Sequence, residues 1–154
     1  MKKISSALVD VASALFLGCV ILAFASVIWR YVLNNSIIWA EELIRYMFIW
    51  LFFLAMPEVT RCGAHLALDL LPNKLTGNAR KVLLVVIEVL CIVFDVVIVI
   101  YGSKIAAINM AQRTASLRIL YGYVYAAIPV GAAIMLVFSA RRIVLILKGK
   151  EEKA

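Results

Sequence analysis

The segment 37–69 constrains the fold more than any other part of the sequence, because its charges lie at the two ends of one apolar run. Glu41 and Glu42 precede this run, which spans 43–59, and Arg61 follows it. A soluble core helix has no need of such a distribution. A membrane helix does, since a charged side chain costs several kcal/mol at mid-bilayer and little at the headgroups. The segment therefore predicts a membrane-spanning helix.

The composition extends this prediction to the whole chain. Of the 154 residues, 66% are apolar and 16% are charged, against roughly 45–50% and about 25% in soluble domains. We therefore predict an all-α integral membrane protein with no room for a soluble catalytic domain. The net charge of +7 does not indicate nucleic-acid binding, because the basic residues lie between and after apolar runs rather than in a basic stripe.

Four apolar runs have about the 20 residues that a helix needs to cross a bilayer. They predict a single four-helix membrane domain over 1–154, with a disordered tail and with spans at about 7–29, 43–59, 82–101 and 123–147. The disordered tail is expected at 148–154. Pro57 is expected to kink or end the second span, because proline lacks the amide hydrogen that a helix interior requires.

The first apolar run also fits a secretory signal peptide, with Ala23-Phe24-Ala25 as the cleavage site. The run continues past that site to Trp29, so we interpret it as a membrane helix. Lys and Arg residues number 11 in the N-terminus, the second connector and the tail, and 5 in the first and third connectors. This excess predicts that both termini lie in the cytoplasm.

Two carboxylates, Glu88 and Asp95, lie inside the third span and share one helical face with Cys91. Carboxylates within a membrane are candidates for proton relays, ion sites or partners of a buried base. Glu88 follows Lys81 by seven residues, so it also fits a hydrated position near the interface. Asp95 is nearer mid-membrane, and we expect it to contact a neighbouring helix or subunit, or to take part in transport.

Polar residues also flank the second span. Arg45 follows Glu41 by four residues and Glu42 by three, so all three can pair on one surface. On the other side, Arg61, His65 and Asp69 form an i, i+4, i+8 series that fits a surface polar network or a docking site.

Catalysis and cofactor binding are not predicted. His65 is the only histidine, which excludes bis-histidine haem and most zinc sites. The three cysteines, Cys19, Cys62 and Cys91, are isolated and odd in number, so they form no disulfide or metal framework. The sequence also lacks a nucleophile with an adjacent base and a glycine-rich phosphate loop. We expect no metal and no cofactor.

Several motifs together resemble the small membrane subunit of TRAP transporters, the DctQ-type family. They are the run Ile38-Trp39-Ala40-Glu41-Glu42-Leu43 followed by Arg45, the pattern Arg61-x-Gly63-x-His65 with Asp69, Arg30-Tyr31, and Ala127-Ile128-Pro129. The resemblance covers about Leu8 to Arg142. The sequence departs from the family at Leu54-Ala55-Met56-Pro57, where members often carry a glycine and no proline.

The resemblance implies a place in the bacterial inner membrane, in an ATP-independent uptake system with two partners. A soluble periplasmic protein captures a carboxylate-bearing solute and delivers it to a large multi-span subunit, which holds the sodium-coupled path. The small subunit packs against the large one, lies in membrane lipid and helps to dock the binding protein. By position, the candidates for the outer docking site or the subunit seam are Trp39, Glu41, Glu42 and Arg45. Arg61, His65 and Asp69 would brace the cytoplasmic side, and Asp95 would be a subunit contact.

Two other functions remain to be compared with this one. The chain could be an independent homodimeric exporter that uses Asp95 or Glu88 as a proton-coupled carboxylate. A quinone-linked redox protein would need paired cysteines or several histidines, so the sequence disfavours it. The solute is not readable from this chain, because specificity would reside in the partners.

Overall fold

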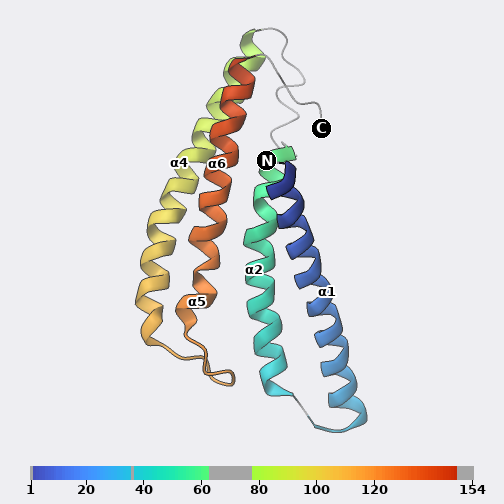
Figure 1. Cartoon of the computed structure of the whole chain (residues 1–154). Coiled ribbons are helices and arrows are strands. Elements are labelled where there is room, and N and C mark those ends of the chain that lie inside the picture. Colours follow the sequence, from blue (N-terminus) through green and yellow to red (C-terminus); the bar gives the residue numbers. More distant parts are fainter. Residues whose placement is uncertain (1, 36, 63–77, 149–154) are drawn as a thin grey trace.

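The computed structural model describes residues 2–35, 37–62 and 78–148 (Figure 1). The elements are helices α1 (Lys2–Val32), α2 (Ile38–Cys62), α4 (Asn78–Ile108), the short 3₁₀ helix η2 (Asn109–Ala111), α5 (Tyr121–Tyr125) and α6 (Ala127–Leu147). Four stretches are long and apolar enough to cross a membrane, namely Ser5–Val32, Ile38–Thr60, Arg80–Ala111 and Tyr121–Leu147. The all-helical architecture with four candidate spans is therefore confirmed. Apart from Lys148, the tail that we predicted to be disordered lies outside the described residues.

The helices extend beyond the apolar runs. α1 and α4 each contain 31 residues, which is more than the ~20 that cross a bilayer. Of the two effects expected of Pro57, a kink or an end of the second span, the second does not occur, because α2 continues through Pro57 to Cys62. Proline removes one backbone hydrogen bond, and in membrane proteins a neighbouring helix can compensate for this loss.

The fourth span consists of two helices that meet at Ala126. Pro129 has no amide hydrogen to donate to the carbonyl of Tyr125, so the regular hydrogen-bond pattern is interrupted there. Ala126 keeps helical dihedral angles, with φ −61° and ψ −21°. The chain therefore passes from α5 into α6 as one span.

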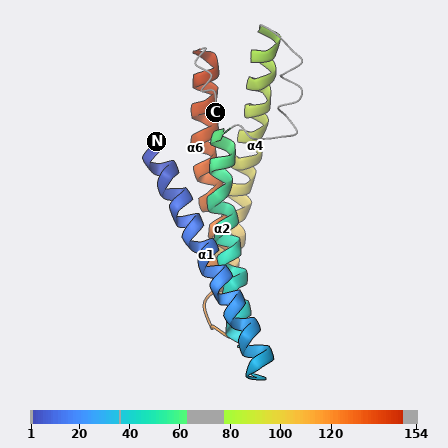
Figure 2. The same ribbon diagram turned by 90° about the vertical axis from the view of Figure 1, so that its right-hand side faces the viewer.

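The helices form an open row rather than a closed bundle. α1 packs against α2, α2 packs against α6, and α6 packs against α4; among the described residues α1 contacts neither α4 nor α6. Figure 1 shows this order as α4, α6, α2, α1, and Figure 2 shows that α1 is inclined to the others. The start of α1, the end of α2, the start of α4 and the end of α6 lie at one end, here called the termini end. The α1–α2 turn and residues 112–120 lie at the opposite, connector end.

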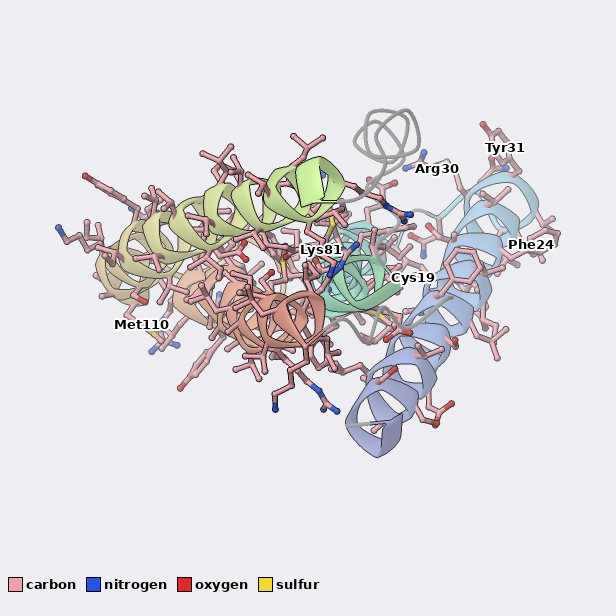
Figure 3. The ribbon with its side chains drawn as sticks, turned by 90° about the horizontal axis from the view of Figure 1, so that it is seen from above. Cys19, Phe24, Arg30, Tyr31, Lys81 and Met110 are labelled. Atoms are coloured by element: carbon pink, nitrogen blue, oxygen red, sulfur yellow. The ribbon has the colours of Figure 1, made fainter. Side chains whose placement is uncertain are left out.

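The residues buried between the helices are mostly small, as membrane helices require for close approach. They include Ala12, Cys19, Ala40, Ala127 and Ala132. Many large apolar side chains are exposed instead, and Phe24 of α1 is 71% exposed. In Figure 3, Cys19 lies between α1 and α2, whereas Phe24 and Tyr31 point away from the other helices. A surface this apolar fits lipid or a membrane partner.

The contact between α2 and α6 depends on two special residues. A Cβ atom added to Gly131 of α6 would lie only 2.5 Å from the carbonyl oxygen of Phe53 in α2. This carbonyl is the one that loses its intrahelical donor because Pro57 has no amide hydrogen. Glycine carries only a hydrogen in place of Cβ, so the two backbones can approach this closely at Gly131.

Candidate functional site at the two ends of the helix row

At the connector end, an ion pair closes the turn between α1 and α2. Arg30 in the last turn of α1 donates from Nη2 to Oε1 of Glu41 in the first turn of α2. Both side chains are about half exposed, at 50% and 48%. Asn34 lies between the two helices with a φ of 49°, a left-handed conformation that asparagine tolerates better than most residues. The ion pair therefore spans the turn at a solvent-accessible position.

Glu42 connects α2 to the distant segment that joins α4 and α5. Its Oε2 accepts hydrogen bonds from the backbone amides of Ser116, at 2.8 Å, and Leu117, at 3.2 Å. Its Oε1 accepts a hydrogen bond from the hydroxyl of Tyr46, one helical turn along α2. A carboxylate that accepts from two backbone amides makes charge-assisted hydrogen bonds, which are stronger than neutral ones. Glu42 therefore holds the connector against the second helix.

Residues 112–120, here called the connector hairpin, are structured by their own hydrogen bonds. Arg113 and Leu120 form an antiparallel bridge. The Thr114 amide donates to the Ile119 carbonyl at 2.8 Å, and the Ile119 amide donates to the Thr114 hydroxyl oxygen at 3.0 Å. Arg118 completes the turn with a φ of 54°. The hairpin is therefore a defined element, and Glu42 additionally holds two of its amides.

The remaining residues predicted near this end, Trp39 and Arg45, are both exposed. Trp39 has 46% of its surface accessible. The expected pairing of Arg45 with Glu41 and Glu42 does not occur within the described part of the chain, because Arg30 and the connector hairpin take up these carboxylates. Helical spacing could not show that other donors compete for the same carboxylates.

At the termini end, a buried ion pair joins α4 to α6. Arg142 Nη1 lies 3.0 Å from Oε1 of Glu88, whose side chain is only 3% exposed. The same nitrogen donates to the carbonyl oxygen of Thr60 in α2 at 3.4 Å. The interpretation of Glu88 as a hydrated interfacial residue was therefore wrong, because Arg142 supplies its counter-charge within the protein. Arg142 thus contacts both neighbours of α6 in the row.

Asp95 lies deeper along the same seam. Two contacts between α4 and α6 bracket it: Glu88 with Arg142 on one side, and Gly102 against Ile128 on the other. Asp95 is 1% exposed, so its carboxylate is enclosed by its own chain and is not on the surface that a partner would touch. Ser139 of α6 is also completely buried.

The third group of predicted residues, on the other side of the second span, lies only partly within the described residues. Arg61 belongs to α2, whereas His65 and Asp69 lie outside the described residues. Nearby, the hydroxyl of Ser5 in α1 donates to Oε2 of Glu58 in α2 at 2.6 Å. The contacts that sequence reasoning missed are those of Arg142, Thr60 and Ser5. The signal for Arg142 was present, because a buried carboxylate such as Glu88 requires a base.

The described ranges contain no group of three or more histidine, cysteine or acidic side chains that could hold a metal ion. Cys19 and Cys91 are free thiols. The polar residues instead tie helices together at the two ends of the row, an arrangement suited to holding a defined shape.

Comparison with known proteins identifies the group to which this architecture belongs. Residues 19–149 match the family described as "Tripartite ATP-independent periplasmic transporters, DctQ component". The chain belongs to the DctQ family. It is therefore a multi-pass membrane protein and the small permease subunit of a TRAP transporter, not an enzyme.

The matches to individual DctQ relatives have low sequence identity. The chain is 32% identical over 88 residues to the C4-dicarboxylate TRAP transporter small permease protein of Vibrio cholerae, a match that covers 56% of this chain and 38% of the relative. It is 24% identical over 119 residues to the sialic acid TRAP transporter small permease protein of the same organism, covering 77% and 69%. A putative TRAP transporter small permease protein of Haemophilus influenzae is 24% identical over 112 residues, covering 72% and 67%.

Proposed function

We propose that this chain is the scaffold subunit for a large membrane transport subunit in the sodium-coupled, binding-protein-dependent uptake of an organic acid. The large subunit holds the transport path. The present chain packs against that subunit and widens the subunit within the membrane. In this proposal the termini end faces the cytoplasm of a bacterial inner membrane and the connector end faces the periplasm. Carboxylate-bearing solutes are proposed because two relatives are named for C4-dicarboxylate and sialic acid.

The open helix row is the observation that carries this proposal. A row of four helices leaves its two broad sides apolar and accessible, as the exposed Phe24, Phe52 and Phe94 illustrate. Such a surface lowers its free energy by packing against another membrane protein. The tripartite family description supplies that partner, together with a periplasmic binding protein.

The placement of charges supports a scaffold rather than a transport path. Glu88 is held by Arg142, and Asp95 is enclosed at the α4–α6 seam. The other described acidic side chains lie near the ends of the helices, at positions 10, 41, 42 and 58. This distribution also disfavours the exporter hypothesis, because a proton-coupled carboxylate must become accessible from both sides of the membrane.

Affinity purification tests the proposal directly. The tagged chain is isolated in mild detergent from native membranes, and the co-purifying proteins are identified by mass. We expect one large hydrophobic subunit in stoichiometric amount, and we expect uptake of the organic acid to be lost when the gene for this chain is deleted. Recovery of a homo-oligomer alone, with proton-dependent export that Asp95→Asn abolishes, would replace the scaffold by the exporter.

Cysteine labelling tests the orientation. In a cysteine-free background, Ala115→Cys reports on the connector end and Lys148→Cys on the termini end, and both positions are exposed. A membrane-impermeant maleimide added to intact cells whose outer membrane is permeabilised should label position 115 alone. Labelling of position 148 alone would show the opposite orientation, with the termini end facing the periplasm.

A further inference from the structure

Met110 of η2 packs its side chain against a glycine of the neighbouring helix α5. A Cβ atom added to Gly122 would lie 2.5 Å from the Met110 Sδ atom and 2.6 Å from its Cγ atom. The thioether therefore occupies the space that any larger residue at position 122 would need. Gly122 is buried, and α5 packs against both α4 and η2. The methionine thus helps to hold the start of α5 against the end of α4.

The surroundings of this contact suit an apolar sulfur atom. The third heavy atom near the same Cβ position, at 2.8 Å, is the carbonyl oxygen of Ala106. A thioether needs no hydrogen-bond donor and packs as an apolar group. A sulfur atom that carried an oxygen would be polar and would need a donor, which a carbonyl group cannot supply.

Met110 is also accessible from outside the protein. It has 39% of its surface exposed, and in Figure 3 it lies at the edge of the molecule, away from α1. It follows Lys104 by six residues, and lysine side chains near helix ends extend to the headgroups. Six residues add about 9 Å along a helix. Met110 therefore lies beyond the hydrocarbon core, at the connector end.

The other methionines that the structure describes are less accessible to water. Met47 and Met56 of α2 and Met135 of α6 are only half-exposed. All three lie within candidate membrane spans, where a polar reagent dissolved in water is scarce. Among the described methionines, Met110 therefore combines the greatest exposure with a sulfur atom that packs between two helices.

We propose that Met110 is an oxidation site, at which conversion of the thioether to methionine sulfoxide loosens the contact between α4 and α5. The oxidant is a dissolved peroxide such as hydrogen peroxide. The sulfur lone pair attacks one peroxide oxygen, an S–O bond forms and the O–O bond breaks. The second oxygen takes the proton of the first and leaves as water. The sulfur is thereby oxidised by two electrons, and the peroxide is reduced by two.

The expected consequence follows from the change in polarity. Oxidation converts a flexible apolar side chain into a polar one and disrupts apolar packing. Two backbone hydrogen bonds next to the contact report on this change. The Tyr121 amide donates to the Gln112 carbonyl at 3.0 Å, and the Ala126 amide donates to the Gly122 carbonyl at 2.9 Å. Both should open more often when the sulfoxide leaves Gly122.

The test uses the full chain, purified from native membranes with the proteins that accompany it and reconstituted in nanodiscs. The sample is treated with hydrogen peroxide, and peptide mass spectrometry measures how fast each methionine gains one oxygen. Hydrogen-exchange mass spectrometry then follows the peptide over 121–126. Met110→Leu removes the sulfur and keeps an apolar side chain, whereas Met110→Gln is polar without oxidation. Met135→Leu is the matched control inside a span.

We expect Met110 to be oxidised at least about tenfold faster than Met47, Met56 and Met135. Peroxide should speed exchange of the Tyr121 and Ala126 amides by about threefold or more, because exchange follows local opening. Methionine sulfoxide reductase should reverse the change. The change should be absent in Met110→Leu and retained in Met135→Leu. Met110→Gln should show faster exchange before any peroxide is added.

Three results would overturn the assignment. Met110 would not be the site if it were oxidised no faster than Met135. Complete oxidation of Met110 without faster exchange over 121–126 would show that the sulfoxide is accommodated at Gly122. Faster exchange in peroxide-treated Met110→Leu would place the sensitive residue elsewhere. None of these results bears on the scaffold function, because the inference depends on the exposure of Met110 and not on the partner subunits.

Discussion

The two ends of the helix row are held by ion pairs in contrasting environments. At the termini end, Glu88 is 3% exposed and its partner Arg142 is 25% exposed, whereas at the connector end both members of the Arg30–Glu41 pair are about half exposed. Removing one member of a buried pair leaves an uncompensated charge, which typically destabilises by roughly 3–5 kcal/mol. An exposed pair contributes about 0–1 kcal/mol. The same kind of ion pair therefore contributes differently to stability at the two ends, because removing one partner costs more where the other partner is buried.

The largest effect is expected at the buried pair. Arg142→Ala should destabilise the chain by roughly 3–5 kcal/mol, because Glu88 remains enclosed without its counter-charge. The measurement is unfolding of the purified complex in a denaturing detergent titration. Glu88→Leu/Arg142→Met should restore most of the stability, since an apolar pair removes the buried charges. A double variant as unstable as Arg142→Ala would show that the contact with the Thr60 carbonyl matters more.

The next effect concerns Gly131 and Gly18, two of the glycines that face neighbouring helices. Gly131→Ala should cost about 1–3 kcal/mol, because the added methyl group meets the Phe53 backbone carbonyl, which cannot move without shifting α2. Gly18→Ala is the matched control between α1 and α2. Its methyl group would meet only the terminal carbon of Met47, at 2.9 Å, and a flexible side chain can move aside. The same unfolding titration should therefore separate the two variants, and equal losses would contradict the special role of the Phe53 carbonyl.

A local effect is expected at Glu42, which accepts hydrogen bonds from two amides in the turn of the connector hairpin. Glu42→Ala should speed hydrogen exchange of the Ser116 and Leu117 amides by about tenfold, because exchange follows local opening. Exchange in the middle of α6 should be unchanged. Hydrogen-exchange mass spectrometry of peptides over 112–121 provides the measurement, and unaltered exchange would show that the hairpin is held by its own bridge alone.

The smallest effect is expected at the exposed pair. Arg30→Ala should destabilise the chain by less than about 1 kcal/mol, since water already solvates both groups. Glu41→Gln should have a similarly small effect, and neither should change assembly with the large subunit. A loss as large as that of Arg142→Ala would remove the contrast between the two ends and would indicate that a partner buries the Arg30–Glu41 pair in the complex.

The sequence predicted the helices better than the contacts between them. Apolar runs and end charges located four spans, because hydrophobic length is a local property. Helix α2 continues through Pro57, with Gly131 of α6 close to the Phe53 carbonyl that lacks its donor, and nothing near Pro57 in the sequence reveals this neighbour. The partners of Glu88 and Glu42 come from distant segments. Local spacing suggested Arg45 for Glu42, whereas the fold brought the Ser116 and Leu117 amides to it.

The meeting of Pro57, the Phe53 carbonyl and Gly131 has a consequence for how this sequence can vary over time. A relative with an ordinary residue in place of the proline donates an amide to that carbonyl within its own helix. A Cβ at position 131 would still meet the same oxygen wherever the two helices lie as close as they do here. Position 131 should therefore stay glycine in DctQ relatives that keep this close approach, whereas position 57 can change between proline and other residues.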